Sequence, residues 1–130
     1  MRFRTVFTDG CFDLLHIGHV RLLQTAKGFG GRLIVGVKSD RVVRELKGHG
    51  RPIVCLESRV EMLRAVRWVD DVHVLDDLTP CKLIDTLKPD VVVKGDDWID
   101  VTAAASITVF VQRTGPGTTG IIESIRGNFS

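Results

Sequence analysis

Two histidines with a glycine between them stand at the start of a predicted helix. His16 and His19 are three residues apart, a spacing that places both side chains on one face of the first helical turn. Gly18 leaves room for a ligand close to the backbone. A helix N-terminus favours anions through its N–H groups and its dipole, and imidazoles there could donate hydrogen bonds to phosphate oxygens. The pattern therefore indicates chemistry on a phosphate group.

The histidine pair has two other interpretations. The same spacing could hold a metal ion, although no third ligand is evident nearby. The two side chains could also be ordinary surface histidines. The spacing alone does not choose among these three.

A glycine-hinged loop with basic residues follows the second predicted strand–helix unit. Lys47 and Arg51 lie in the segment 46–52 (LKGHGRP), and such a loop suits a clamp on phosphates. The alternative is a solvated loop with incidental charge.

Short runs of β-branched residues alternate with longer amphipathic segments along the whole chain. Strands are predicted at 5–8, 33–37, 72–75, 91–93 and 107–111. Helices are predicted at 16–27, from a cap at Ser39 or Asp40 to 46, at 57–68, from Thr79-Pro80 to Lys88, and at 119–126, with a turn at Asp9-Gly10. This alternation implies βαβ units and a mostly parallel sheet with helices on both faces. Ligands of such sheets bind outside the carboxyl ends of the strands, so we expect the site there.

Composition restricts the class of protein. The 130 residues, of which 44% are hydrophobic, suit one soluble domain spanning residues 1–130. The 18 Lys and Arg nearly balance the 16 Asp and Glu, with no block of like charge, so we expect neither nucleic acid nor a membrane surface as a partner. No apolar run is long enough for a membrane span, and the N-terminus lacks a signal-peptide pattern. Three cysteines without a CxxC pair favour reduced thiols in a cytoplasmic protein.

The segment from residue 10 to residue 19 resembles the GxFDxxHxGH signature of the cytidylyltransferase-like nucleotidyltransferases. Every fixed position of that signature is filled, by Gly10, Phe12, Asp13, His16, Gly18 and His19. The resemblance continues from about Thr5 to Arg126. It implies a single-domain, Rossmann-like three-layer α/β fold with a mostly parallel sheet. It also implies transfer of a nucleoside monophosphate from a nucleoside triphosphate to a phosphorylated small molecule, with release of pyrophosphate.

The resemblance further implies roles for individual residues. The catalytic set is His16, His19 and Lys47, with the histidines stabilising the α-phosphate and the leaving group. Asp13 is expected to orient the turn or help place the metal rather than to act as a base, because a phosphate nucleophile is already ionised near neutral pH. The residues expected to bind nucleotide are Thr8, Gly10, Cys11, Phe12, Asp13, Gly18, Lys94, Gly95, Asp96, Asp97, Trp98, Arg113, Thr118 and Thr119.

Arg51 and Arg59 are expected to bind the phosphorylated substrate. Arg59 matches a family arginine that approaches phosphate, but it could equally pair with Glu57 or Glu61 on the surface. Mg²⁺ is expected to arrive with the nucleotide, held mainly through its phosphates, and we expect no set of protein metal ligands.

Two segments of the predicted nucleotide site need a closer description. In the first, Asp96 and Asp97 can accept hydrogen bonds from an exocyclic amine of the base, and Trp98 can pack either against the ligand or in the core. The second, residues 113–119, resembles a family signature that is usually Ser-Thr-Thr at a helix N-terminus. Gly117 stands where the serine is usual, so phosphate binding there must rely on backbone N–H groups and the two threonines that follow.

The resemblance divides between two groups of enzymes. The residues expected to line the crevice, together with the chain length, look more like glycerol-3-phosphate cytidylyltransferases, and we take CTP and glycerol 3-phosphate as the leading substrates. The framework of the middle of the chain looks like the adenylyltransferase domains that make ADP-heptose from ATP and heptose 1-phosphate, which is the alternative. A non-catalytic nucleotide-binding domain is a third interpretation. Because family members are commonly homodimers, we expect a homodimer.

Overall fold

Five runs of mostly apolar residues form the strands of one sheet. The computed structural model describes residues 4–95, 107–111 and 117–129. The strands are β1 (Thr5–Gly10), β2 (Arg32–Lys38), β3 (Asp71–Leu75), β4 (Val91–Gly95) and β5 (Ile107–Val111). They lie in the order β3-β2-β1-β4-β5, and each neighbouring pair is parallel. The order reverses between β1 and β4, so the crevice expected of a doubly wound sheet opens at the carboxyl ends of these two strands.

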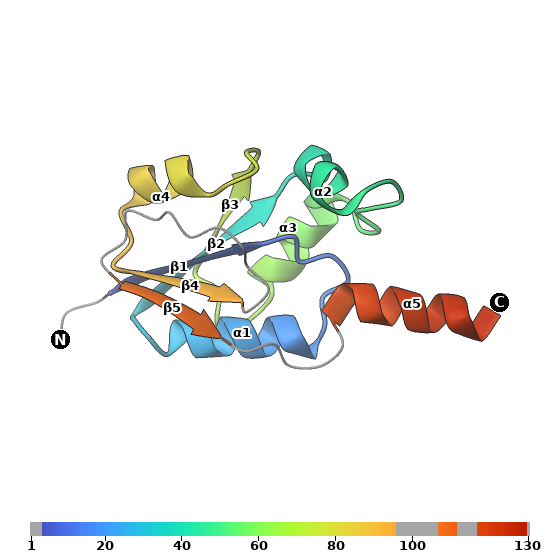
Figure 1. Cartoon of the computed structure of the whole chain (residues 1–130). Coiled ribbons are helices and arrows are strands. Elements are labelled where there is room, and N and C mark those ends of the chain that lie inside the picture. The colour runs from blue at the N-terminus through green and yellow to red at the C-terminus, as the bar shows by residue number, and fades with distance from the viewer. Residues whose placement is uncertain (1–3, 96–106, 112–116, 130) are drawn as a thin grey trace.

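Helices cover both faces of this sheet. The helices are α1 (Ile17–Lys27), α2 (Asp40–Lys47), α3 (Leu56–Arg64), α4 (Cys81–Leu87) and α5 (Gly117–Phe129). In Figure 1, α1 and α4 lie on opposite faces, and α5 extends beyond the carboxyl ends of the strands. The arrangement confirms the expected single-domain Rossmann-like α/β fold.

Alternation along each strand divides the buried side chains between the two faces. Val6 packs with Leu23 of α1 and Leu63 of α3, whereas Phe7 packs with Ile84 of α4. Gly36 of β2 makes room for Phe7, because a Cβ on Gly36 would lie 2.9 Å from the end of that ring. The interior of the sheet is thus apolar on both faces, and its charged groups are confined to the strand ends.

All of the predicted strands and helices are present, but several boundaries differ. Asp9 and Gly10 belong to β1 rather than to a turn. The third helix ends at Arg64 rather than at residue 68, because its backbone bonding changes to i→i−3 pairs such as Val66 N–H to the Leu63 carbonyl. Pro80 occupies the N-cap of α4, so Thr79 does not cap that helix. The last helix begins two residues earlier than predicted and extends to Phe129.

The described part of the chain contains neither a membrane-spanning helix nor a disulfide bond. Within it, none of the helices combines the length and the apolar character that crossing a membrane requires. All three cysteines lie in this part and form no disulfide: Cys55 is exposed, and Cys11 and Cys81 are half-buried.

Candidate nucleotidyl-transfer site

The two signature histidines meet at the start of α1. His16 is the N-cap, and its Nδ1 accepts the Gly18 N–H at 3.0 Å. The backbone N–H of His16 donates in turn to Nδ1 of His19 at 3.3 Å, and the two rings stack with their centroids 3.8 Å apart. Because both Nδ1 atoms accept from the backbone, each neutral imidazole carries its proton on Nε2. The pair is therefore preorganised as two Nε2–H donors at a helix N-terminus.

The turn that leads into this pair is conformationally strained. Phe12 and Leu14 have positive φ angles of 51° and 47°, a left-handed conformation that costs side-chain-bearing residues on the order of 1–3 kcal/mol each. The ring of Phe12 is buried, and its centroid lies 5.2 Å from that of His19. Such strain persists only where surrounding contacts hold the backbone in place. The contact between the Phe12 and His19 rings links the strained turn to the histidine pair.

Asp13 holds the turn to the glycine-hinged loop. Its Oδ2 accepts from Nε of Arg51 at 3.0 Å and from the Ile53 N–H at 2.8 Å, and its Oδ1 accepts from the Val54 N–H at 2.8 Å. Burial opposes ionisation, but these three donors outweigh it and hold the pKa of Asp13 below its ordinary value. Both carboxylate oxygens are thus engaged within the protein, which supports orientation of the turn rather than metal placement as the role of Asp13.

Arg59 differs most from its predicted place. It is 1% exposed, and four of its N–H groups are used: Nε donates to the Val54 carbonyl, Nη1 to the carbonyls of Cys11 and Lys38, and Nη2 to Asp40. The surface pair with Glu57 or Glu61 is therefore wrong. In place of the expected contact with substrate, the structure shows Arg59 joining the signature turn, the end of β2 and the start of α2.

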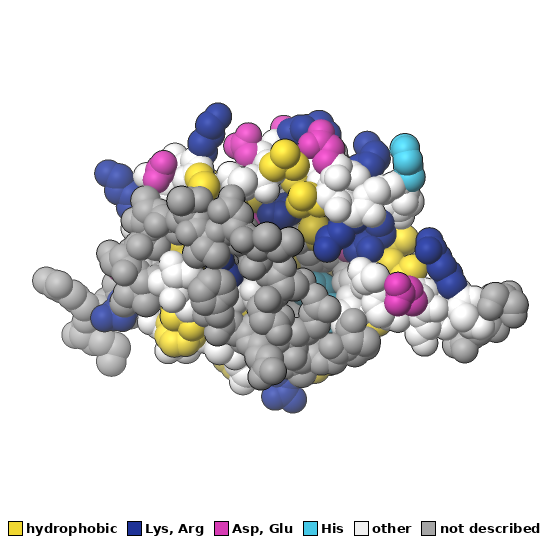
Figure 2. All heavy atoms as spheres, viewed as in Figure 1, with side chains coloured by type: hydrophobic (Ala, Val, Ile, Leu, Met, Phe, Trp, Pro, Cys, Tyr) yellow, Lys and Arg dark blue, Asp and Glu magenta, His cyan; other side chains and the backbone are white. Residues whose placement is uncertain are grey.

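Several cations surround the half-buried thiol of Cys11 in the signature turn. Burial raises the pKa of this thiol, while the charges of Lys38, Lys47, Arg59 and Arg51 act to lower it. Four cations therefore act on one point at the carboxyl ends of β1 and β2. Figure 2 shows Lys and Arg side chains on this side of the molecule, over α2 and the loop that follows it. Lys47 is itself exposed at the end of α2. Lys38, Arg51 and Arg59 are each paired with an aspartate, so Lys47 adds the excess positive charge that suits a triphosphate.

Charged side chains are also buried at the ends of the central strands. Nζ of Lys38 donates to Oδ2 of Asp9 at 2.8 Å, and the Asp9 side chain is 1% exposed. Within the described residues, the other Asp9 oxygen, Oδ1, has no hydrogen-bond partner. Lys94 is buried in β4, on the same face of the sheet by alternation.

Thr8 is the second residue whose place differs from the prediction. It is fully buried, and its hydroxyl donates to the Val93 carbonyl at 2.8 Å, linking β1 to β4. The expected contact of this side chain with nucleotide is therefore not available in this conformation. Gly10 and Gly95, by contrast, lie at the carboxyl ends of those strands, where a ligand backbone contact is expected.

The start of α5 reaches the signature turn. The hydroxyl of Thr118 donates to the Asp13 carbonyl, and Thr119 beside it is exposed. Gly117 has a φ of 75°, a conformation that favours glycine. The glycine that stands in place of the usual serine is thus the residue type that this backbone requires. The remaining predicted nucleotide ligands, Asp96, Asp97, Trp98 and Arg113, lie outside the described residues.

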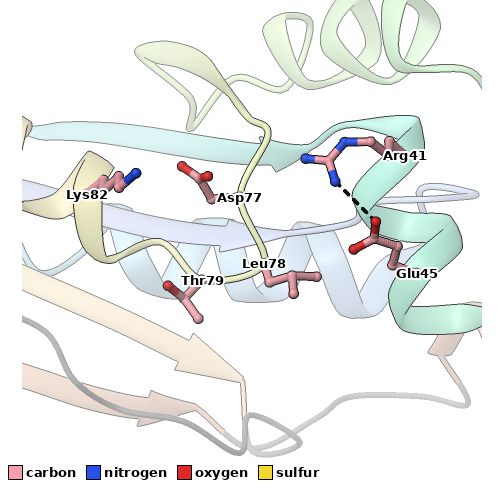
Figure 3. Close-up of a pocket in the computed structure, with 6 residues that line it drawn as sticks. All are labelled: Arg41, Glu45, Asp77, Leu78, Thr79 and Lys82. Carbon is pink, nitrogen blue, oxygen red and sulfur yellow. Dashed lines mark hydrogen bonds and ion pairs between the residues drawn. The ribbon is translucent and has the colours of Figure 1, made fainter.

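A separate cavity of about 330 Å³ lies between α2 and the β3–α4 connection. Figure 3 shows the side chains that line it: Arg41, Glu45, Asp77, Leu78, Thr79 and Lys82. None of them was predicted as a site residue, because their separation along the chain hides their proximity. The buried Asp9–Lys38 pair was missed for the same reason, although a lysine directly after an apolar strand was a usable signal.

No group of three or more His, Cys, Asp or Glu side chains is placed to hold a metal ion in the part of the chain that the structure describes. An Mg²⁺ ion carried on the triphosphate is compatible with this, because such an ion needs few protein ligands.

Known proteins resemble this chain in sequence and in structure. The family model described as cytidylyltransferase-like matches residues 7–113. The bifunctional protein HldE of Campylobacter fetus is 47% identical over 129 residues, which cover 94% of this chain and 28% of that protein. HldE of Koribacter versatilis is 55% identical over 95 residues, covering 73% and 20% respectively. The chain thus spans between a fifth and somewhat over a quarter of the length of these relatives.

A solved structure shares the fold. The lipopolysaccharide core biosynthesis protein of Thermoplasma volcanium superposes with a TM-score of 0.77 at 23% identity, covering 88% of this chain and all of the other.

Proposed function

The chain belongs to the cytidylyltransferase-like family of nucleotidyltransferases, and we propose that it transfers an adenylyl group from ATP to heptose 1-phosphate and releases pyrophosphate. The observation that carries this proposal is the stacked His16–His19 pair at the start of α1. Its geometry presents Nε2–H donors where an α-phosphate would lie against a helix N-terminus.

The reaction follows from this arrangement without a covalent enzyme intermediate. A phosphate oxygen of the acceptor attacks the α-phosphorus of the nucleotide in line, and the bond to the β-phosphate oxygen breaks as pyrophosphate leaves. His16 and His19 stabilise the charge that develops on the α-phosphate. The β- and γ-phosphates are held by Lys47, by the Thr119 hydroxyl and by backbone N–H groups at the start of α5, including that of Thr118, whose hydroxyl is used by the Asp13 carbonyl. Asp13 and Arg59 hold the signature turn in place against the loop after α2, the end of β2 and the start of α2.

The choice of adenylyl over cytidylyl transfer reverses the order of preference drawn from the sequence. The curated relatives are HldE proteins, whose adenylyltransferase domain makes ADP-heptose, and they match nearly the whole chain at 43–47% identity. This agreement over the whole chain supports the framework resemblance more strongly than the local features supported glycerol-3-phosphate cytidylyltransferase. CTP with glycerol 3-phosphate becomes the second candidate.

The test is pyrophosphate release in the presence of Mg²⁺, with ATP and CTP each combined with heptose 1-phosphate and glycerol 3-phosphate. Turnover with ATP and heptose 1-phosphate, and mass-spectrometric detection of ADP-heptose, is the expected result. Turnover only with CTP and glycerol 3-phosphate would restore the cytidylyl assignment. Tight nucleotide binding without turnover of any pair would favour the non-catalytic interpretation.

A further inference from the structure

The cavity between α2 and the β3–α4 connection differs from the crevice beside the histidine turn in the charge of its side chains. Its lining contains two cations, Arg41 and Lys82, and two carboxylates, Glu45 and Asp77, so its formal charge is balanced. The crevice at Cys11, in contrast, holds the cations Lys38, Lys47, Arg51 and Arg59. Asp9, Asp13 and Asp40 pair with Lys38, Arg51 and Arg59, so the exposed Lys47 leaves the crevice with an excess of positive charge. A phosphate is therefore drawn to the crevice, and an uncharged polar group suits the cavity better.

Arg41, the cation that α2 contributes to the cavity, forms ion pairs with two carboxylates. Arg41 pairs with Glu45 at 3.1 Å and with Oδ1 of Asp76 at 3.3 Å, and it also donates to the Asp76 carbonyl. These contacts hold the guanidinium in place and offset its charge. In Figure 3 the guanidinium of Arg41 and the ammonium of Lys82 extend toward each other, with Asp77 between them. The cavity thus presents hydrogen-bond donors and acceptors of both charges rather than a cluster of cations.

The lining matches the chemistry of a polyol. Carboxylates such as Asp77 accept hydrogen bonds from hydroxyl groups, the Lys82 ammonium donates to hydroxyl oxygens, and the Thr79 hydroxyl can do both. Leu78, which is 52% exposed, offers an apolar contact of the kind that the C–H face of a sugar makes. The volume of about 330 Å³ is sufficient for a small metabolite.

The position of the cavity relates it to the reacting centre. Helix α2 follows β2 directly, the other wall follows β3, and the order β3-β2-β1 places both beside the strand that leads to His16. Strands β2 and β3 are thus the first and second neighbours of β1 on one side of the sheet. An acceptor whose phosphate lies at the histidines can extend its distal end into the cavity if it carries a sugar ring. A glycerol chain is too short to fill it.

We propose that this cavity binds the hydroxyl-bearing distal end of a sugar phosphate acceptor, with Asp77, Thr79 and Lys82 as its specificity-determining residues. The proposal rests on the nucleotidyl transfer proposed above and adds where the acceptor is recognised. It also gives a structural reason for preferring a sugar phosphate to glycerol 3-phosphate.

Steady-state kinetics of the Asp77→Asn, Thr79→Val and Lys82→Met variants test the proposal. Each variant should raise the KM for heptose 1-phosphate about 10- to 100-fold, the effect of losing one hydrogen bond to a charged or polar partner. The KM for ATP should stay within about twofold, because the triphosphate contacts are elsewhere. A glucose 1-phosphate acceptor, which lacks the side chain of a heptose, should lose less in each variant.

Asp85→Asn is the matched control, because Asp85 is exposed on α4 and does not line the cavity. It should leave both KM values unchanged, and circular dichroism should show all four variants folded. A wild type that turns over heptose 1-phosphate, with unchanged KM in the three cavity variants, would overturn this inference and leave the proposed function standing. A wild type that neither binds nor turns over a sugar phosphate would overturn both.

Discussion

His16 and His19 complete each other as a capping box built from two imidazoles. The backbone N–H of His16 donates to Nδ1 of His19, and Nδ1 of His16 accepts from the helix that His19 belongs to. One pair of side chains therefore both starts α1 and orients the donors proposed to act on the α-phosphate. The capping contacts use the Nδ1 atoms and the proposed catalysis uses the Nε2 atoms of the same rings, so mutation can separate the two roles.

His16→Asn and His16→Ala should be equally inactive but unequally stable. Both remove the Nε2–H donor, so pyrophosphate release should fall on the order of 10²–10³-fold in each. Asparagine still caps the helix whereas alanine does not, so urea denaturation should find the alanine variant about 1 kcal/mol less stable than the asparagine variant. A rate near that of the wild type in His16→Asn would mean that the histidine is only a cap.

Asp13→Asn should reduce the dependence of stability on pH in the acid range. Because the folded protein holds the pKa of Asp13 below its ordinary value, the carboxylate contributes stability above the unfolded-state pKa of about 3.9, and this contribution disappears as the pH falls through the folded-state pKa. Urea titrations from pH 7 to pH 3 should show the variant less stable at pH 7 and with a shallower decline. Parallel curves for variant and wild type would contradict the assigned role.

Arg59→Met should be strongly destabilising. It leaves the carbonyls of Cys11, Lys38 and Val54 without their donor in a buried position, at a cost of about 3–5 kcal/mol. Arg59→Lys retains the charge but cannot reach all of these acceptors, so intermediate stability is expected. Arg64→Met, at an exposed position on the same helix, should stay within about 0.5 kcal/mol of wild type by urea denaturation. Equal stability of the two methionine variants would refute the role of Arg59 as a link between segments.

Glycine-to-alanine changes at the two ends of α5 should act in opposite directions. Gly117 has a φ of 75°, so alanine there should cost about 1–2 kcal/mol. Gly127 lies in the helix with open space where a Cβ would be, so alanine there should gain roughly 0.5 kcal/mol. Thermal denaturation followed by far-ultraviolet circular dichroism distinguishes the two. A Gly117→Ala variant as stable as wild type would mean that α5 starts in another conformation.

The fold was largely predictable because its signals are local. The run from Leu33 to Val37 is apolar throughout, as expected of a strand covered on both faces, and Ser39 does cap the next helix. The errors lie at boundaries, where tertiary contacts compete with propensity. Asp9 reads as a turn residue, yet it continues β1 because Lys38 of the neighbouring strand neutralises its buried carboxylate.

The site was predictable only in part. The spacing within residues 10–19 predicts the histidine pair by itself. At a helix N-terminus, residues three apart come into contact whatever the rest of the chain does. The role of Arg59 could not be predicted from local spacing. Its partner carbonyls are 5, 21 and 48 residues away along the chain, and only the folded structure shows that they converge on one guanidinium.

The sequence by itself therefore determined the parallel α/β framework and the histidine pair, since both depend on short-range periodicity and on the geometry of one helix turn. The tertiary structure alone decided which donors engage Asp13, that Arg59 and Thr8 face inward, and that side chains of α2 and of the β3–α4 connection line an open cavity. The physical reason is that burial and pairing depend on which strands become neighbours. In this sheet that order places residues tens of positions apart at one edge.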